Sequence, residues 1–201
     1  MTRPIPSIKE CLSFIEHYEM LGNIRDHSFM VARVANALVE GLVHNRGPSI
    51  PDSNKVIAGA LLHDIAKTRC LQNNGHHAKD GQDICNELGY PDIGVIVLEH
   101  VVLKDFNAHL YKKGDFGAKE LVYYADKRVR HDQVVSLQDR LDYIIERYGK
   151  GDPVKEKYIH HNFSTTFKLE ELLFAHLDFS PENLILQLTD NFLTGGSNPA
   201  R

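Results

Sequence analysis

Apolar residues recur at helical spacing along most of the chain. Ser7, with Glu10 three positions later, has the form of an N-terminal capping box ahead of the first apolar positions. We expect that first helix to end at Gly22, and a second helix, apolar along one face, to run from about residue 26 to residue 43. Residues 44–53 contain a glycine and two prolines and are expected to form a loop.

The most apolar predicted helix spans about residues 55–67. We expect it at the centre of the molecule, because a helix that is apolar on nearly every side must be buried. The segment 104–117 is the longest predicted loop, and no segment shows the alternation of a half-buried strand. The sequence therefore predicts an all-α fold, with further helices over residues 77–88, 91–103, 118–131 and 136–149 and helix starts at Pro153 and Pro181.

Composition narrows the class of protein. With 201 residues, of which 42% are hydrophobic, the chain is long enough for a packed core. Its apolar runs are too short to cross a bilayer and its first ten residues have no apolar signal segment, so we expect a cytoplasmic protein with no membrane attachment. Three cysteines without paired spacing argue against a thiolate metal site. A net charge of -4 gives no reason to expect a specific nucleic-acid partner.

His63 and Asp64 close the apolar run of the central helix. A histidine and a carboxylate that enter a core together need partners, because burial of an unpaired charge is costly. Adjacent residues on a helix do not face each other, but both can converge on a third group, and a cation is the obvious candidate. The alternative interpretation is a helix end with solvated polar residues.

Four further residues are placed in a comparable way. His27 begins a helix whose other face is apolar, His100 lies among apolar residues, and Asp126 ends an apolar run. His77 stands at the start of its helix. Each of them alone is more often a core or capping residue than a ligand. Together, histidines and aspartates on separate helices of a bundle are a known way to build a metal site.

The order of these residues resembles the pattern of the HD-domain metal-dependent phosphohydrolases. That pattern is a His, a His-Asp pair, two more His and an Asp, and it extends here from about residue 26 to residue 149. The resemblance is closest to the small bacterial members with an HDIG-like core, although Ala66 replaces the glycine of that motif. For the third histidine, Gly81 four residues later favours His77 over His76.

The resemblance implies a bundle of about five core helices within residues 1–150, an HD-type domain. Residues 151–194 are then expected to form a helical extension packed on that domain, and residues 195–201 a disordered tail.

The same resemblance implies the ligands of two ions. His27, His63, Asp64 and Asp126 would hold the first ion. In members that have all six residues, the two remaining histidines, here His77 and His100, hold a second ion and the aspartate of the pair bridges both. We therefore expect a binuclear site. Ligands of this kind without thiolates suit Fe, Mn, Co, Ni or Zn.

The chemistry expected of such a site is hydrolysis of a phosphate ester or phosphoanhydride in a nucleotide-like small molecule. The ion would convert a bound water to hydroxide and polarise a phosphoryl oxygen. Asp64 and Lys67 are the expected catalytic residues, with Lys67 one helical turn after His63. Lys67 and Arg128 are the candidates for contact with the substrate phosphate. The alternatives are a solvated lysine at a helix end and a solvated basic turn after Asp126.

Two other functions stay open at this level. Relatives with six such ligands include di-iron oxygenases of the same fold, and a non-catalytic nucleotide-binding sensor would keep a similar pocket. The sequence does not decide the substrate, the number of ions or the oligomeric state, for which a homodimer is one option.

Overall fold

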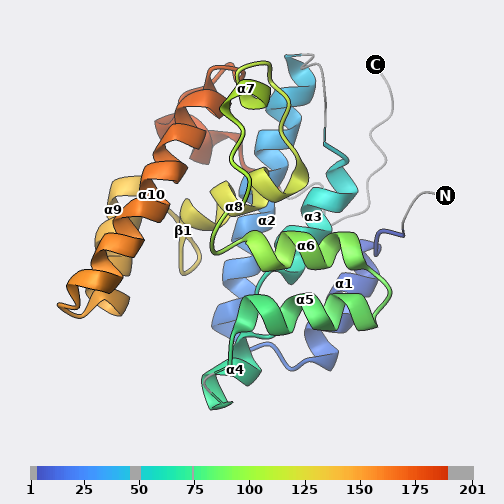
Figure 1. The fold of residues 1–201 in the computed structure, drawn as a ribbon. Coiled ribbons are helices and arrows are strands. Elements are labelled where there is room, and N and C mark those ends of the chain that lie inside the picture. Colours follow the sequence, from blue (N-terminus) through green and yellow to red (C-terminus); the bar gives the residue numbers. More distant parts are fainter. Residues whose placement is uncertain (1–3, 46–50, 74, 190–201) are drawn as a thin grey trace.

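The computed structural model describes residues 4–45, 51–73 and 75–189. Within these ranges the fold is an all-helical bundle with one two-stranded hairpin (Figure 1). The expected tail over 195–201 lies outside the described residues, as do residues 46–50 of the expected loop over 44–53. In chain order the elements are α1 (Ile8–His17), α2 (Gly22–His44), α3 (Ser53–Leu62), α4 (Lys67–Asn73), α5 (His77–Glu87), α6 (Pro91–Glu99), α7 (Ala108–Tyr111), α8 (Ala118–Lys127), β1 (Val129–Arg130), β2 (Gln133–Val134), α9 (Leu137–Ile144), the π-helix η1 (Ile145–Gly149), α10 (Pro153–Phe174) and the 3₁₀-helix η2 (Pro181–Gln187).

The N-terminal capping box is confirmed. The Ser7 hydroxyl accepts a hydrogen bond from the backbone N–H of Glu10, and the Glu10 carboxylate accepts one from the backbone N–H of Ser7. The expectation that Gly22 ends the first helix is wrong, because Gly22 is the first residue of α2. The chain has already turned at Glu19, whose φ is 49°.

Three predicted helices are shorter than expected, and each ends beside a residue of interest. Helix α6 stops at Glu99 rather than near residue 103, just before His100. The central helix α3 stops at Leu62 rather than near residue 67, and a turn over residues 63–66 leads into α4. Helix α8 stops at Lys127 rather than near residue 131, and the β1–β2 hairpin follows. Strands of two residues are too short to show an alternating pattern, so this hairpin could not be predicted from periodicity.

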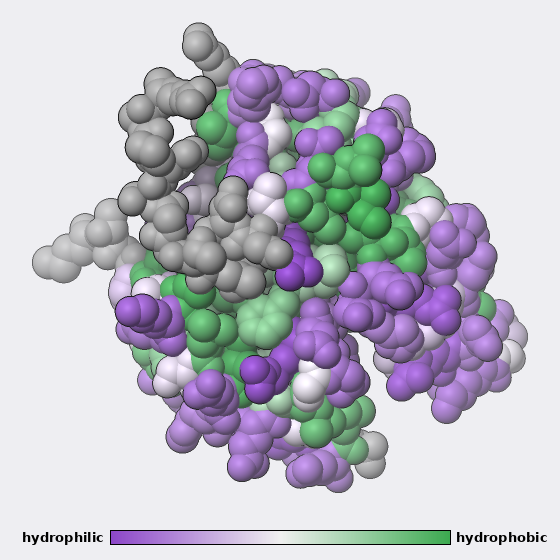
Figure 2. Space-filling view, turned by 180° about the vertical axis from the view of Figure 1, so that it is seen from behind, coloured by the Kyte–Doolittle hydropathy of each residue, from purple (hydrophilic) through white to green (hydrophobic). Residues whose placement is uncertain are grey.

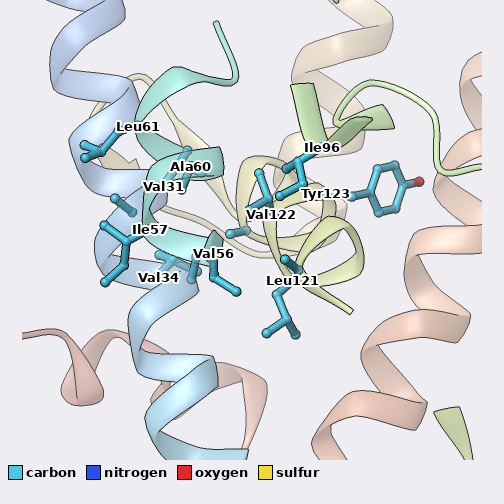
Figure 3. Close-up of a cluster of buried hydrophobic side chains, with 14 of the residues drawn as sticks. Val31, Val34, Val56, Ile57, Ala60, Leu61, Ile96, Leu121, Val122 and Tyr123 are labelled. Carbon is cyan, nitrogen blue, oxygen red and sulfur yellow. The ribbon is translucent and has the colours of Figure 1, made fainter. Parts of the chain in front are cut away.

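The core lies where α2, α3 and α8 meet (Figure 3). All seven residues over 56–62 of α3 are buried, which confirms the expected central position of that helix. Val31 of α2 and Val122 of α8 are both fully buried in the same cluster. Burial of each such side chain contributes about 1.5–3 kcal/mol, so this three-helix contact is a main source of stability.

Glycines allow the neighbouring helices to approach closely. A Cβ atom on Gly59 of α3 would lie 2.8 Å from the Ile96 side chain of α6, and one on Gly81 of α5 would lie 2.7 Å from Val97. Real Cβ atoms do not come so close, so a larger residue at either position would push α6 away. These contacts hold α3, α5 and α6 together at the helix ends that carry His63, His77 and His100.

The C-terminal helix α10 packs against α7, α8, α9 and η1, at the left of Figure 1. The Tyr123 hydroxyl on α8 is 2.7 Å from the Thr166 hydroxyl and donates to Asn162 Oδ1 at 2.9 Å. The segment η2 then returns to contact α2. The division of the chain into a domain up to residue 150 and an extension after it stays a prediction.

The surface mixes polar regions with smaller apolar patches, as the view from behind shows (Figure 2). Val154 and Leu186 are 78% and 75% exposed. Scattered apolar side chains of this kind are normal on protein surfaces and do not by themselves indicate a partner. Among the described helices, none is both long enough and apolar enough to cross a membrane.

Candidate metal centre

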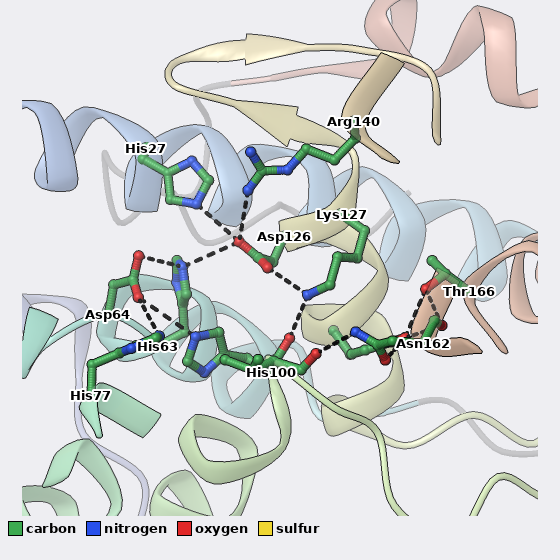
Figure 4. A network of polar contacts seen from close by, with 12 residues as sticks. His27, His63, Asp64, His77, His100, Asp126, Lys127, Arg140, Asn162 and Thr166 are labelled. Atoms are coloured by element: carbon green, nitrogen blue, oxygen red, sulfur yellow. Dashed lines mark hydrogen bonds and ion pairs between the residues drawn. The ribbon is translucent and has the colours of Figure 1, made fainter. Parts of the chain in front are cut away.

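Side chains from five helical segments meet in one buried cluster (Figure 4). Asp64 lies at its centre: His63 Nε2 is 3.3 Å from Asp64 Oδ2. Two further histidine nitrogens, His77 Nε2 and His100 Nε2, are 3.6 and 3.5 Å from the other oxygen, Oδ1. At the far side, Asp126 Oδ1 is 3.0 Å from His27 Nε2 and 3.7 Å from His63 Nε2. The structure thus brings together all six residues that the sequence singled out: His27, His63, Asp64, His77, His100 and Asp126.

Helix ends orient two of these imidazole rings. His63 directly follows α3, and His100 directly follows α6. The last carbonyls of a helix have no partner within the helix, and one at each end accepts from the ring. Nδ1 of His63 is 2.7 Å from the carbonyl oxygen of Ala60, and Nδ1 of His100 is 2.6 Å from that of Val97. Because Nδ1 then carries the proton, Nε2 presents its lone pair to the cluster.

His27 is oriented by a different element. It lies in the second turn of α2, and its Nδ1 is 2.8 Å from the backbone carbonyl oxygen of His131 in the β1–β2 turn. The backbone of His131 has a φ of 56°, a conformation that non-glycine residues rarely adopt. The hairpin that the sequence did not predict therefore supplies the group that directs His27 Nε2 towards Asp126.

The cluster leaves acceptors facing acceptors. His63 Nε2 and Asp64 Oδ1 are both buried and have no hydrogen-bond partner. Asp64 Oδ1 faces the Nε2 atoms of His77 and His100, and a lone pair on nitrogen and a carboxylate oxygen repel each other unless a positive charge lies between them. Buried polar atoms without a partner are rare, so Asp64 Oδ1 and His63 Nε2 both require an explanation. A divalent cation satisfies both atoms, and the nitrogen and oxygen donors are of a kind that such ions bind.

The donors fall into two groups that share one residue. His27, His63 and Asp64 offer three ligand atoms that lie within 4.8 Å of one another, and so do Asp64, His77 and His100. Asp64 belongs to both groups because its two oxygens face different neighbours. The residues present therefore fit a cation, and the cluster has donors for two.

Lysines accompany both carboxylates. Lys67 Nζ donates to Asp64 Oδ2 at 2.6 Å. Lys127 Nζ donates to Asp126 Oδ2 at 2.7 Å and to the backbone carbonyl of His100 at 2.8 Å. The lysine side chains differ in exposure, at 32% for Lys67 and 7% for Lys127. Lys127 thus fixes one oxygen of Asp126 so that the other faces the histidines.

The protonation states of His77, His100 and the two carboxylates suit ligands, whereas at His63 burial lowers the pKa but the neighbouring Asp64 and Asp126 carboxylates raise it by more. Burial lowers the pKa of His77 to about 4 and also lowers the pKa of His100, so both rings are neutral near pH 7. Burial opposes ionisation of Asp64 and Asp126, but Lys67 beside Asp64 and Lys127 beside Asp126 hold both pKa values well below the usual range. Neutral imidazole and ionised carboxylate are the forms that bind metal ions.

The placement of Arg128 differs from the expectation that it contacts substrate or lies in a solvated turn. Arg128 is only 4% exposed, and its guanidinium points to the C-terminal helices. It donates to Glu170 at 3.0 Å and to the carbonyl oxygen of Pro181 at 2.9 Å. It also donates to the Tyr124 hydroxyl and the carbonyl oxygen of Val135. Through these four hydrogen bonds Arg128 links α8 to the C-terminal segments, and none of the four goes to one of the six clustered residues.

Sequence reasoning did not identify two residues at the cluster. Lys127 was expected in a solvated turn, whereas it is 5% exposed and contacts Asp126. Arg140 of α9 was not singled out, yet its Nη2 lies 4.0 Å from Asp126 Oδ1. In the sequence, Arg140 directly precedes the apolar Leu141 of an amphipathic helix, and this position does not distinguish it from a surface arginine.

Comparison with protein families gives one match. The family model of the HD domain matches residues 24–144, more than half of the chain. No curated protein and no solved structure matches the chain. The matched region begins just before His27 and contains every residue of the cluster. The chain therefore belongs to the HD domain family, whose members are generally metal-dependent hydrolases.

Proposed function

We propose that this protein hydrolyses a phosphate ester or phosphoanhydride in a nucleotide-like small molecule, and that it uses divalent transition-metal ions to do so. The observation that carries the proposal is the set of histidine lone pairs that face two ionised carboxylates in a buried cluster. The match to the HD domain supports the same reaction class.

The two donor groups support a pair of ions. His27, His63, Asp64 and Asp126 would hold one, and His77 and His100 the other, with Asp64 shared between them. The ions would be Fe, Mn, Co, Ni or Zn, since the donors are nitrogen and oxygen. When bound, such ions lower the pKa of water towards neutrality and polarise a phosphoryl oxygen.

The charges around the cluster favour an anionic substrate. Lys67, Lys127 and Arg140 already outnumber the carboxylates of Asp64 and Asp126. Bound divalent ions would add further positive charge in a site where burial strengthens electrostatic interactions. A phosphate group offsets this excess, and it gains charge as it reacts. Fixed positive groups therefore stabilise the transition state more than the ground state.

One side of the cluster reaches solvent. The side chains of His77 and Lys67 are 31% and 32% exposed, whereas those of His63 and His100 are almost completely buried. Substrate is expected to enter on the side of α4 and α5. Lys67 remains the candidate for contact with the substrate phosphate, because its amine is beside Asp64 and also accessible.

The neighbouring residues His76 and His77 allow a matched test of the assignment of His77 as a metal ligand. The metal content of the purified full-length chain would be measured, followed by phosphate release from nucleotides and dinucleoside polyphosphates. His77→Ala is expected to lower metal content and activity, because His77 Nε2 lies 3.6 Å from Asp64 Oδ1, whereas His76→Ala should change neither, because the side chain of His76 is exposed. Equal activity of both variants would refute the assignment of His77.

Other outcomes of the same screen identify the alternative functions. Consumption of dioxygen with a substrate, without phosphate release, would establish an oxygenase. Tight binding of nucleotides to the metal-loaded protein without turnover of any of them would establish a sensor. Either result would overturn the proposed hydrolysis.

A further inference from the structure

An arginine that the metal site does not require lies at the edge of the cluster. Arg140, on α9, is 9% exposed, and Figure 4 shows its guanidinium directed towards Asp126. Its Nη2 is 4.0 Å from Asp126 Oδ1, too long for a hydrogen bond, and its Nε is buried without a hydrogen-bond partner. A buried guanidinium with unused donors is costly, so a ligand that accepts from it would be stabilised.

The neighbours of Arg140 hold it in place without neutralising it. Its guanidinium carbon lies 5.5 Å from the centre of the Tyr143 ring, one turn later on α9. The ring is also contacted by Arg130 of β1, at 4.4 Å, and by the ring of His131. Stacking on an aromatic ring orients a guanidinium and leaves its N–H donors free.

The carboxylate that Arg140 approaches has other partners. Asp126 receives hydrogen bonds from Lys127 on Oδ2, and its Oδ1 lies closest to His27. Arg140 is therefore not needed to neutralise Asp126. It adds a planar, permanently charged group beside the histidines, and phosphate oxygens are the acceptors that this geometry matches best.

We propose that Arg140, oriented by Tyr143, forms an anion subsite that binds the phosphate group of the substrate next to Asp126. The proposal rests on the proposed function for the identity of the anion as a substrate phosphate. It replaces Arg128, the arginine that the sequence suggested, with one that the fold brings to the cluster from α9.

Binding of inorganic phosphate to the Mn-loaded full-length protein tests this subsite by calorimetry. Loss of charge-assisted hydrogen bonds predicts that Arg140→Met weakens phosphate binding by about 10-fold or more. Metal content, measured on the same samples, should stay at the wild-type level. The matched control is Arg130→Met, which removes an exposed arginine from the same Tyr143 ring and should leave phosphate affinity within about twofold.

If the Arg140→Met variant does not fold, the more conservative variant Arg140→Lys tests the same subsite. It keeps the charge but not the planar fork, so phosphate binding should still weaken by about threefold or more while the melting temperature is unchanged. Wild-type phosphate affinity in the folded variants, or loss of metal in them, would overturn the subsite. If Arg140 governs phosphate binding but no phosphate compound is hydrolysed, the subsite stands and the proposed function fails.

Discussion

Two buried polar networks lie at the same end of α8. They differ in how fully their buried donors and acceptors are hydrogen-bonded. Asp126 and Lys127 belong to the candidate metal centre, whereas Tyr124 and Arg128 belong to a network that joins α8 to Glu170 of α10. Both networks contain buried charges. In the network of Arg128, hydrogen bonds from the guanidinium reach four acceptors. In the cluster, His63 Nε2 and Asp64 Oδ1 have no hydrogen-bond partner.

The difference separates a structural role from a binding role. A buried network that satisfies its own donors and acceptors holds elements together and has no capacity left for a ligand. A buried network with unused lone pairs is incomplete without one. Adjacent basic residues at the end of a single helix thus serve opposite purposes, and removal of one residue from each network tests that distinction.

The largest effect on stability is expected from the complete network. Arg128→Ala would leave the Glu170 carboxylate and the Tyr124 hydroxyl without their partner, and loss of one member of a buried ion pair costs about 3–5 kcal/mol. Urea unfolding should show this loss. The double variant Arg128→Met/Glu170→Gln, which removes both charges, should recover part of it. Metal affinity of the folded fraction should be close to that of wild type, and a large decrease would contradict the separation of the two networks.

A second effect is expected at Lys127. Lys127→Met keeps the apolar stem but removes the hydrogen bonds to Asp126 and to the carbonyl of His100. Loss of a group that orients a metal ligand typically lowers metal affinity by about 10–100-fold. Competition with a chelator would measure it. Lys119→Met is a control, because Lys119 pairs with Glu99 and contacts none of the six cluster residues. An unchanged metal affinity in Lys127→Met would exclude the orienting role.

The last effect develops only at alkaline pH and concerns an apolar region outside both networks. Burial raises the pKa of the Cys11 and Cys85 thiols to about 12. In the unfolded chain these thiols ionise near their ordinary pKa of 9.0. Stability from the two thiols is therefore complete below pH 9 and decreases as the pH rises from 9 towards 12. The decrease should be about 1 kcal/mol per thiol for each pH unit in this range.

Urea unfolding at pH 8 and pH 10 would measure this dependence. The variant Cys11→Ala/Cys85→Ala should lose less stability over the same interval than wild type does. Chelation of the metal should leave the difference between the two proteins unchanged, since both thiols lie in the apolar core. An equal pH dependence in both proteins would show that these thiols are accessible in the folded state.

The amino-acid pattern was sufficient for the helical fold and for the candidate ligands. Helical periodicity depends on local spacing, so the central position of α3 and the starts of α1, α9 and α10 were predictable. The six candidate ligands were identified because their order along the chain resembles the HD-domain pattern, and three of them, His63, Asp64 and Asp126, also end apolar runs. The residues at which α3 and α8 end could not be predicted. The tight turn after Leu62 and the hairpin after Lys127 depend on contacts with distant parts of the chain.

What only the tertiary structure decided is the direction in which each charged side chain points. Lys127 and Arg128 are adjacent and both basic, and nothing local distinguishes the one beside Asp126 from the one beside Glu170. Arg140 reaches the cluster because the hairpin returns α9 to it. Spacing along one helix specifies a face of that helix, whereas the partner of the face is set by how the helices pack, which is a property of the whole chain.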